Sequence, residues 1–93
     1  MSDKIRNKHL TITGRVQGVG FRYSAVLKAR EHHLKGFVKN QYDGSVFIEA
    51  EGEETDLDHF IQWCHRGPFS ARVDHVSQCT GSIKNYTSFS VKH

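Results

Sequence analysis

The stretch HLTITGRVQGVGFR, residues 9–22, changes its hydrophobic spacing halfway along. In the first half, Leu10 and Ile12 alternate with two threonines, as expected for a strand with one face against a core. We therefore predict a strand over residues 9–14. The second half is rich in glycine and leads into a segment with a different period.

That following segment has the spacing of a helix. Phe21, Ala25 and Ala29 recur at every fourth position among residues that favour helices. The spacing predicts a helix of about three turns over residues 21–33. A strand and a helix are thus joined by a glycine-rich turn.

A hairpin is predicted next. Two extended runs, residues 36–40 and 46–50, flank the pair Asp43-Gly44. Glycine accepts a positive φ without strain, so Asp-Gly between two such runs is typical of a tight turn. The second and third strands are therefore expected to be antiparallel neighbours.

The clearest helix follows the hairpin. Thr55 and Asp58 resemble a capping box at its start, and Gly67-Pro68 supplies a stop signal at its end. The apolar residues between them fall at positions i, i+3, i+4 and i+7, namely Leu57, Phe60, Ile61 and Cys64.

Two strands complete the predicted order. Residues 72–79 form the first, in which Val73 and Val76 break strict alternation and indicate a bulge. Phe89 and Val91 form the second, a short C-terminal strand. The order predicts an α+β, ferredoxin-like βαββαβ sandwich with both helices on one face of an antiparallel-rich sheet.

Length and composition suit one small domain. The chain has 93 residues, a net charge of +3 and no low-complexity stretch. We expect a flexible N-terminal segment over residues 1–8 and a single domain over residues 9–93. The N-terminal residues are polar, which favours a cytoplasmic protein with no membrane partner.

Cysteine and histidine do not indicate a cofactor or metal. Cys64 and Cys79 lack the spacing of metal ligands, and we expect both to be buried free thiols. The seven histidines are scattered and are interpreted as surface residues. The basic residues are also spread along the chain, so no nucleic-acid footprint is predicted.

The glycine-rich turn can bind a small anion. Its backbone N–H groups and the positive end of the following helix would form a cradle, to which Arg22 adds a guanidinium. The P-loop pattern and the dinucleotide pattern GxGxxG are both absent. Taken alone, a glycine-rich turn is usually only a turn and such an arginine is usually a solvated charge.

Two longer strings resemble the signatures of the acylphosphatase family. The first is Gly14-x-Val16-Gln17-Gly18-Val19-x-Phe21-Arg22. The second is Gly36-Phe37-Val38-Lys39-Asn40-x-x-x-Gly44-x-Val46, with Gly52 further on. Both signatures are complete, and the likeness extends from about His9 to Val91.

The resemblance implies a metal-independent hydrolase of acyl phosphates. In it Arg22 and loop amides bind the phosphate, while Asn40 holds the attacking water. The implied phosphate-binding loop consists of Gln17, Gly18, Val19, Gly20, Phe21 and Arg22. The implied ligands are a small acyl phosphate and inorganic phosphate or sulfate, bound by a monomer without nucleic acid or cofactor.

Other interpretations stay open at this point. Asn40 could instead cap the hairpin turn through a local hydrogen bond. Residues 35–38 loosely match the RNA-stacking strand of an RRM, and the loop could sense an anion without catalysis. Acylphosphatase-like domains also occur in larger carbamoyl-transferring maturation proteins, but this chain lacks their zinc-finger cysteines and their length.

Two further expectations concern the C-terminal carboxylate and the acyl group of the substrate. The terminal carboxylate of His93 is expected to pair with Arg22 when no substrate is bound. Nothing in the sequence defines a pocket for the acyl group, so broad specificity is expected.

Overall fold

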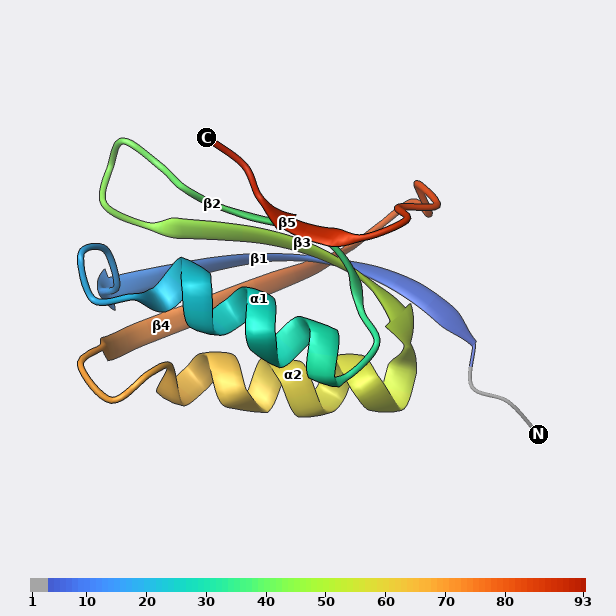
Figure 1. Cartoon of the computed structure of the whole chain (residues 1–93), viewed down its shortest axis with the longest axis horizontal. Helices are drawn as coiled ribbons and strands as arrows, with labels where there is room; N and C mark the ends of the chain where they lie inside the picture. Colours follow the sequence, from blue (N-terminus) through green and yellow to red (C-terminus); the bar gives the residue numbers. More distant parts are fainter. Residues whose placement is uncertain (1–3) are drawn as a thin grey trace.

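The computed structural model describes residues 4–93 and confirms the ferredoxin-like fold class. Its elements are β1 (Ile5–Arg15), α1 (Phe21–Glu31), β2 (Lys35–Asn40), β3 (Val46–Glu53), α2 (Glu54–Arg66), β4 (Arg72–Gly81) and β5 (Phe89–Val91). The sheet order is β4-β1-β3-β2-β5, and only the β2–β5 pair is parallel. Both helices cover one face of this sheet (Figure 1). Within residues 4–93, no helix is long and apolar enough to cross a membrane.

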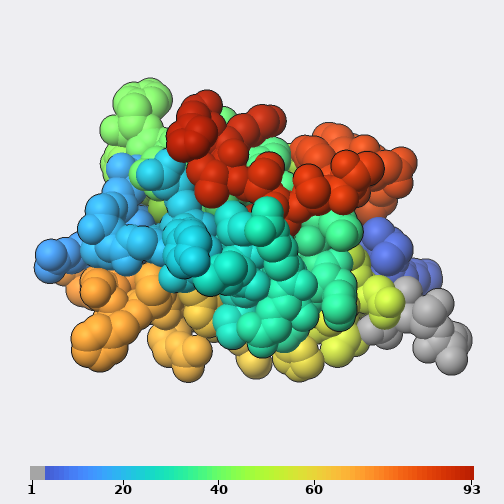
Figure 2. Space-filling view, in the orientation of Figure 1, coloured from blue at the N-terminus to red at the C-terminus, as the bar shows by residue number. Residues whose placement is uncertain are grey.

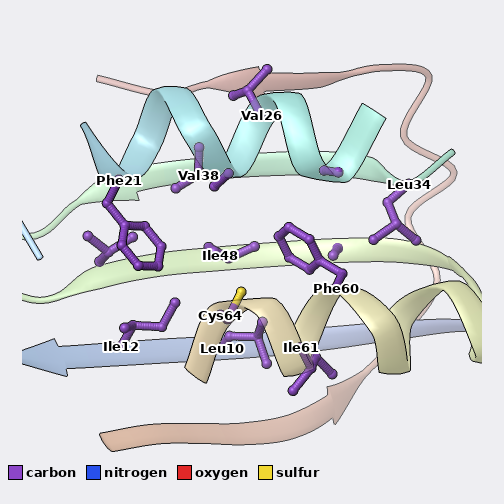
Figure 3. Packing of buried hydrophobic residues seen from close by; sticks show 14 of the residues in the cluster. Leu10, Ile12, Phe21, Val26, Leu34, Val38, Ile48, Phe60, Ile61 and Cys64 are labelled. Atoms are coloured by element: carbon purple, nitrogen blue, oxygen red, sulfur yellow. The ribbon is translucent and has the colours of Figure 1, made fainter. Parts of the chain in front are cut away.

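The core lies between the helices and the covered face of the sheet. The four apolar residues predicted for α2 are its buried residues, which confirms the helical spacing. In Figure 3, Phe60 and Cys64 of α2 point towards Ile48 of the central strand β3. Burial raises the pKa of the Cys64 thiol, so this thiol stays protonated and inert.

The first strand is longer than predicted. It begins at Ile5, so the expectation of a flexible segment over residues 1–8 is wrong for residues 5–8; residues 1–3 lie outside the described part of the chain. Ile5 is already paired with Glu53 of β3. The polar composition of residues 5–8 does not indicate a strand that packs on a core. Asn7 is nevertheless fully buried, because its partners are polar side chains.

Three local expectations also need correction. α2 begins at Glu54, so Thr55 lies inside the first turn and is not the capping residue. α1 ends at Glu31, two residues before the predicted end at His33. The positive φ of His33, 60°, is incompatible with a continued right-handed helix. Cys79 is exposed, because the helices cover only one face of the sheet.

The predicted bulge and helix stop are confirmed. Thr13 pairs with His75 but Gly14 pairs with Val73, so β4 carries one extra residue at this point. Gly67 follows α2 with a φ of 71°.

The other face of the sheet carries a buried polar cluster. Asn7 Nδ2 donates to Glu49 Oε2 at 2.9 Å and to Glu51 Oε2 at 2.8 Å. Lys84 and Tyr86 of the segment joining β4 to β5 add bonds to these two carboxylates. This cluster fastens the 82–88 segment to β3 and thereby holds β5 beside β2.

The cluster predicts a specific response to acid. Burial alone would raise the pKa of Glu49, but hydrogen bonds from Lys84 and Asn7 outweigh it and lower the pKa to about 2. Because the pKa of Glu49 is lowered in the folded state, this group stabilises the fold at pH values above 4.5, the ordinary pKa of a glutamate, and the contribution is lost as the pH falls towards about 2. We expect Glu49→Gln to cost about 2 kcal/mol of unfolding free energy at pH 6 and much less at pH 2.5.

Urea unfolding of both proteins at several pH values measures this difference. Glu53→Gln is the matched control, because Glu53 is exposed at the end of the same strand. A difference between wild type and Glu49→Gln that stays constant from pH 6 to pH 2.5 would contradict the prediction.

Candidate active site

The loop over residues 16–20 joins β1 to α1 at one end of the sheet (Figure 1). Gly18 and Gly20 have φ values of 73° and 78°, in the left-handed region that disfavours side chains. A Cβ built at either glycine would have no heavy atom within 4 Å. The positive φ, and not a lack of space, therefore requires glycine here. The turn therefore curls back into the start of the helix.

The start of α1 is left open for a ligand. Gly20 is its capping residue and has no side chain to bond the first N–H groups of the helix. The first turn also contains no acidic residue that would neutralise the positive end of the helix. Both features favour an anion at this position.

The loop is anchored on both sides. The side chains of Val16 and Phe21 are buried in the core, each about 1% exposed. Between them, Gln17 Nε2 donates to the carbonyl oxygens of Gln41 at 2.7 Å and Ser45 at 2.9 Å. The loop is thereby fixed to the hairpin between β2 and β3.

One cavity of about 500 Å³ brings together the two polar side chains that the sequence singled out. Arg22 from the first turn of α1 and Asn40 from the last position of β2 both line it, together with Gly18 and Gly20. Arg22 is partly exposed, and no ion pair or hydrogen bond of its guanidinium is found within residues 4–93. Its charge is therefore available to a ligand.

Asn40 has a buried acceptor without a partner. Its Oδ1 is inaccessible to solvent and accepts no hydrogen bond from the described part of the chain. Leaving such an atom unsatisfied costs about 1–3 kcal/mol, and this observation marks a position where a ligand or water belongs.

The hairpin turn does not need Asn40. Asp43 accepts from the backbone N–H of Ser45 at 3.0 Å and from its hydroxyl at 2.7 Å. These bonds lower the pKa of Asp43 below its ordinary value. The alternative that Asn40 caps the turn is therefore wrong for this structure.

The other predicted loop residues divide into two groups. Phe21 lines the cavity with the two glycines, whereas the side chains of Gln17 and Val19 do not. Gln17 is directed at the hairpin, and Val19 is packed against the core. A prediction based on backbone amides could not foresee where these side chains point.

The expected ion pair of Arg22 with the carboxylate of His93 is absent among residues 4–93. His93 does line the same cavity, because it shares the face of Val91 two residues earlier. It lies beyond the end of β5, directly after Lys92, whose backbone N–H donates to the carbonyl oxygen of Val38 at 2.9 Å.

The cavity extends beyond the predicted phosphate site. Its remaining lining residues are Tyr23, Val26, Leu27, Arg30, Ser90 and Val91, together with Val16. Four of these follow helical spacing along α1, the same spacing that the core positions of this helix follow.

The chemistry available here is anion binding and the positioning of water. An oxyanion can be surrounded by Arg22, the start of the helix and the glycines. Asn40 can accept a hydrogen bond from a ligand or a water molecule. No group of three or more His, Cys, Asp or Glu side chains in residues 4–93 has the arrangement of a metal site.

Comparison with known proteins gives one consistent result. The family model described as Acylphosphatase matches residues 8–91. A protein named acylphosphatase from Mannheimia succiniciproducens is 49% identical over 87 residues, which covers 92% of this chain and 97% of that relative.

Solved structures agree with the sequence matches. The crystal structure of acylphosphatase from Bacillus subtilis superposes with a TM-score of 0.93 at 35% identity, over 97% of this chain and 100% of that one. Full-length HypF in its phosphate- and nucleotide-bound form matches with a TM-score of 0.89 at 30% identity, over all of this chain but 12% of HypF.

The anchoring of the loop by Gln17 can be tested through anion affinity. Gln17→Ala removes two hydrogen bonds that hold the loop to the hairpin, without removing any group that lines the cavity. We expect inorganic phosphate to bind about five- to tenfold more weakly, because each bond contributes about 0.5–1.5 kcal/mol. Isothermal titration calorimetry with phosphate measures this.

The control is Gln78→Ala, the same change at an exposed position of β4 far along the sheet. Wild-type phosphate affinity in a folded Gln17→Ala protein would show that the loop does not depend on this anchor.

Proposed function

The chain belongs to the acylphosphatase family, and we propose that it hydrolyses acyl phosphates with Arg22 and Asn40 as its working side chains. The observation that carries this proposal is the unpartnered, buried Oδ1 of Asn40 in the same cavity as the open loop and Arg22. An acceptor without a partner next to an anion cradle is the arrangement that a phosphate and a water molecule would complete.

Arg22 and the backbone of residues 17–22 hold the phosphoryl group. The guanidinium offers a two-pronged donor, and the N–H groups at the start of α1 add further donors. These donors are fixed before substrate binds, so they stabilise the charge that develops on the phosphoryl oxygens in the transition state.

Asn40 positions the attacking water. The side-chain amide of Asn40 offers both an acceptor and donors that can orient a water molecule, and an oxygen lone pair of this water stays free to attack phosphorus. An amide is too weakly basic to take the proton, which passes to a phosphoryl oxygen of the substrate instead. The water oxygen bonds to phosphorus as the bond between phosphorus and the carboxyl oxygen breaks.

The leaving group explains why two such side chains suffice. An acyl phosphate releases a carboxylate, which is a stable anion near neutral pH and needs little protonation. A paired general acid and base is therefore unnecessary, in agreement with a cavity lined by neither Asp nor Glu.

The proposed working form is a cytoplasmic monomer that acts as one domain, which includes residues 5–8 of β1. The proposed ligands are a small acyl phosphate and inorganic phosphate or sulfate, without nucleic acid or a membrane.

An RNA-binding role is disfavoured by the position of Phe37. This side chain is 8% exposed, because it packs against Phe47, Tyr86 and Lys92. A base could stack on it only if this packing were disrupted.

The test is hydrolysis of benzoyl phosphate in the presence of EDTA. We expect turnover by the wild type and losses of about a hundredfold or more in kcat for Arg22→Ala and for Asn40→Ala, as is typical for removing a transition-state donor or a positioning group. Arg15→Ala is the matched control, because Arg15 is exposed and outside the cavity.

Thermal unfolding must first show that each variant is folded. A folded wild type that binds phosphate but does not turn over the substrate would favour an anion sensor. Full activity in both variants would reject the assigned roles.

A further inference from the structure

The cavity that holds the phosphate site continues into an apolar groove. Tyr23, Val26 and Leu27 of α1 form one wall, and Val91 of β5 lies opposite. α1 and β5 are in contact along this line, and Figure 2 shows the C-terminal residues against the first turns of α1. The groove starts at the loop and is continuous with it.

The groove has a defined length and a closed end. Arg22 and Arg30 lie eight residues apart on α1, which corresponds to about 12 Å along the helix axis. Arg30 Nη2 donates to the carbonyl oxygen of Phe89 at 3.1 Å, so its side chain bridges α1 and β5 at the far end. Between the two arginines, the α1 wall is apolar.

Two of the wall residues are exposed. Tyr23 is 69% exposed and Leu27 is 50% exposed, although both are large and apolar and lie one helical turn apart. Exposed apolar surface that borders a polar site commonly contacts a ligand. A cavity of about 500 Å³ also exceeds what a phosphate alone would fill, and falls within the range of pockets for small organic ligands.

We infer that this groove binds the acyl group of the substrate and favours longer aliphatic chains over the acetyl group. The inference rests on the proposed function, because the phosphoryl group in the loop places the acyl group in the same cavity. Tyr23 and Leu27 are then specificity-determining residues, which contact the leaving group and not the reacting phosphorus.

The experiment compares acetyl, butyryl and hexanoyl phosphate. Their parent acids have nearly the same acidity, so differences report contact with the chain and not the quality of the leaving group. A fully buried methylene contributes about fourfold in affinity, and in a half-open groove about twofold per methylene is expected. Four methylenes separate acetyl from hexanoyl phosphate, so KM should fall about sixteenfold. The kcat should change little, because these contacts are made equally in the ground state and the transition state.

Leu27→Ser should reduce the hexanoyl-to-acetyl ratio of kcat/KM by about fivefold, and Tyr23→Ala is a second variant of the same wall. Ile83→Ser is the matched control, because Ile83 is a similarly exposed apolar residue outside the cavity. It should leave the whole series unchanged. Competitive inhibition by inorganic phosphate is measured in parallel. Because phosphate has no acyl group, its inhibition constant reports on the loop and not on the groove.

The outcomes separate this inference from the proposed function. If the wild type hydrolyses acetyl phosphate but shows the same KM for all three chains, the groove inference fails and the function stands. An undiminished preference in both Leu27→Ser and Tyr23→Ala would also overturn it. A flat series together with a dimer that is lost in Leu27→Ser would assign the patch to contact between two copies. If the wild type hydrolyses none of the three, both proposals fail.

Discussion

The backbone of the loop between β1 and α1 must keep several N–H groups unpaired and still hold one shape. Unpaired donors are costly when they are buried, and a loop with two left-handed glycines has high conformational entropy when it is free. The structure meets both demands by fixing the loop from outside: Val16 and Phe21 are inserted into the core, and Gln17 bonds the hairpin carbonyls. The positions of Arg22 and the helix start relative to Asn40 follow from these anchors.

The regular elements were predictable where one face of an element is buried by apolar residues. The four buried residues of α2 fall at helical spacing in a polar sequence, so its type and orientation were evident. The start of β1 was not predictable, because Asn7 is buried by two carboxylates that lie more than forty residues away. Local patterns contain no information about such a long-range polar contact.

The candidate site also has a part that was predictable from the sequence and a part that was not. Arg22 and Asn40 belong to recognisable strings, and the fold brings both to one cavity. The groove wall was not recognised, because its positions on α1 alternate with the core positions Phe21, Ala25 and Ala29. With apolar residues on both faces of a short helix, spacing alone does not separate the side that packs from the side that binds.

The parallel pairing of β5 with β2 has a consequence for the order in which the molecule is assembled. On the ribosome, the loop, α1 and β2 emerge long before Phe89–Val91, so the opposite wall of the groove is added last. Strand pairs with such large sequence separation incur a large loop-closure entropy before they gain contacts, which slows folding. A nascent chain can thus contain every residue of the phosphate site and still lack β5, so the cavity is completed only when Phe89–Val91 docks beside β2.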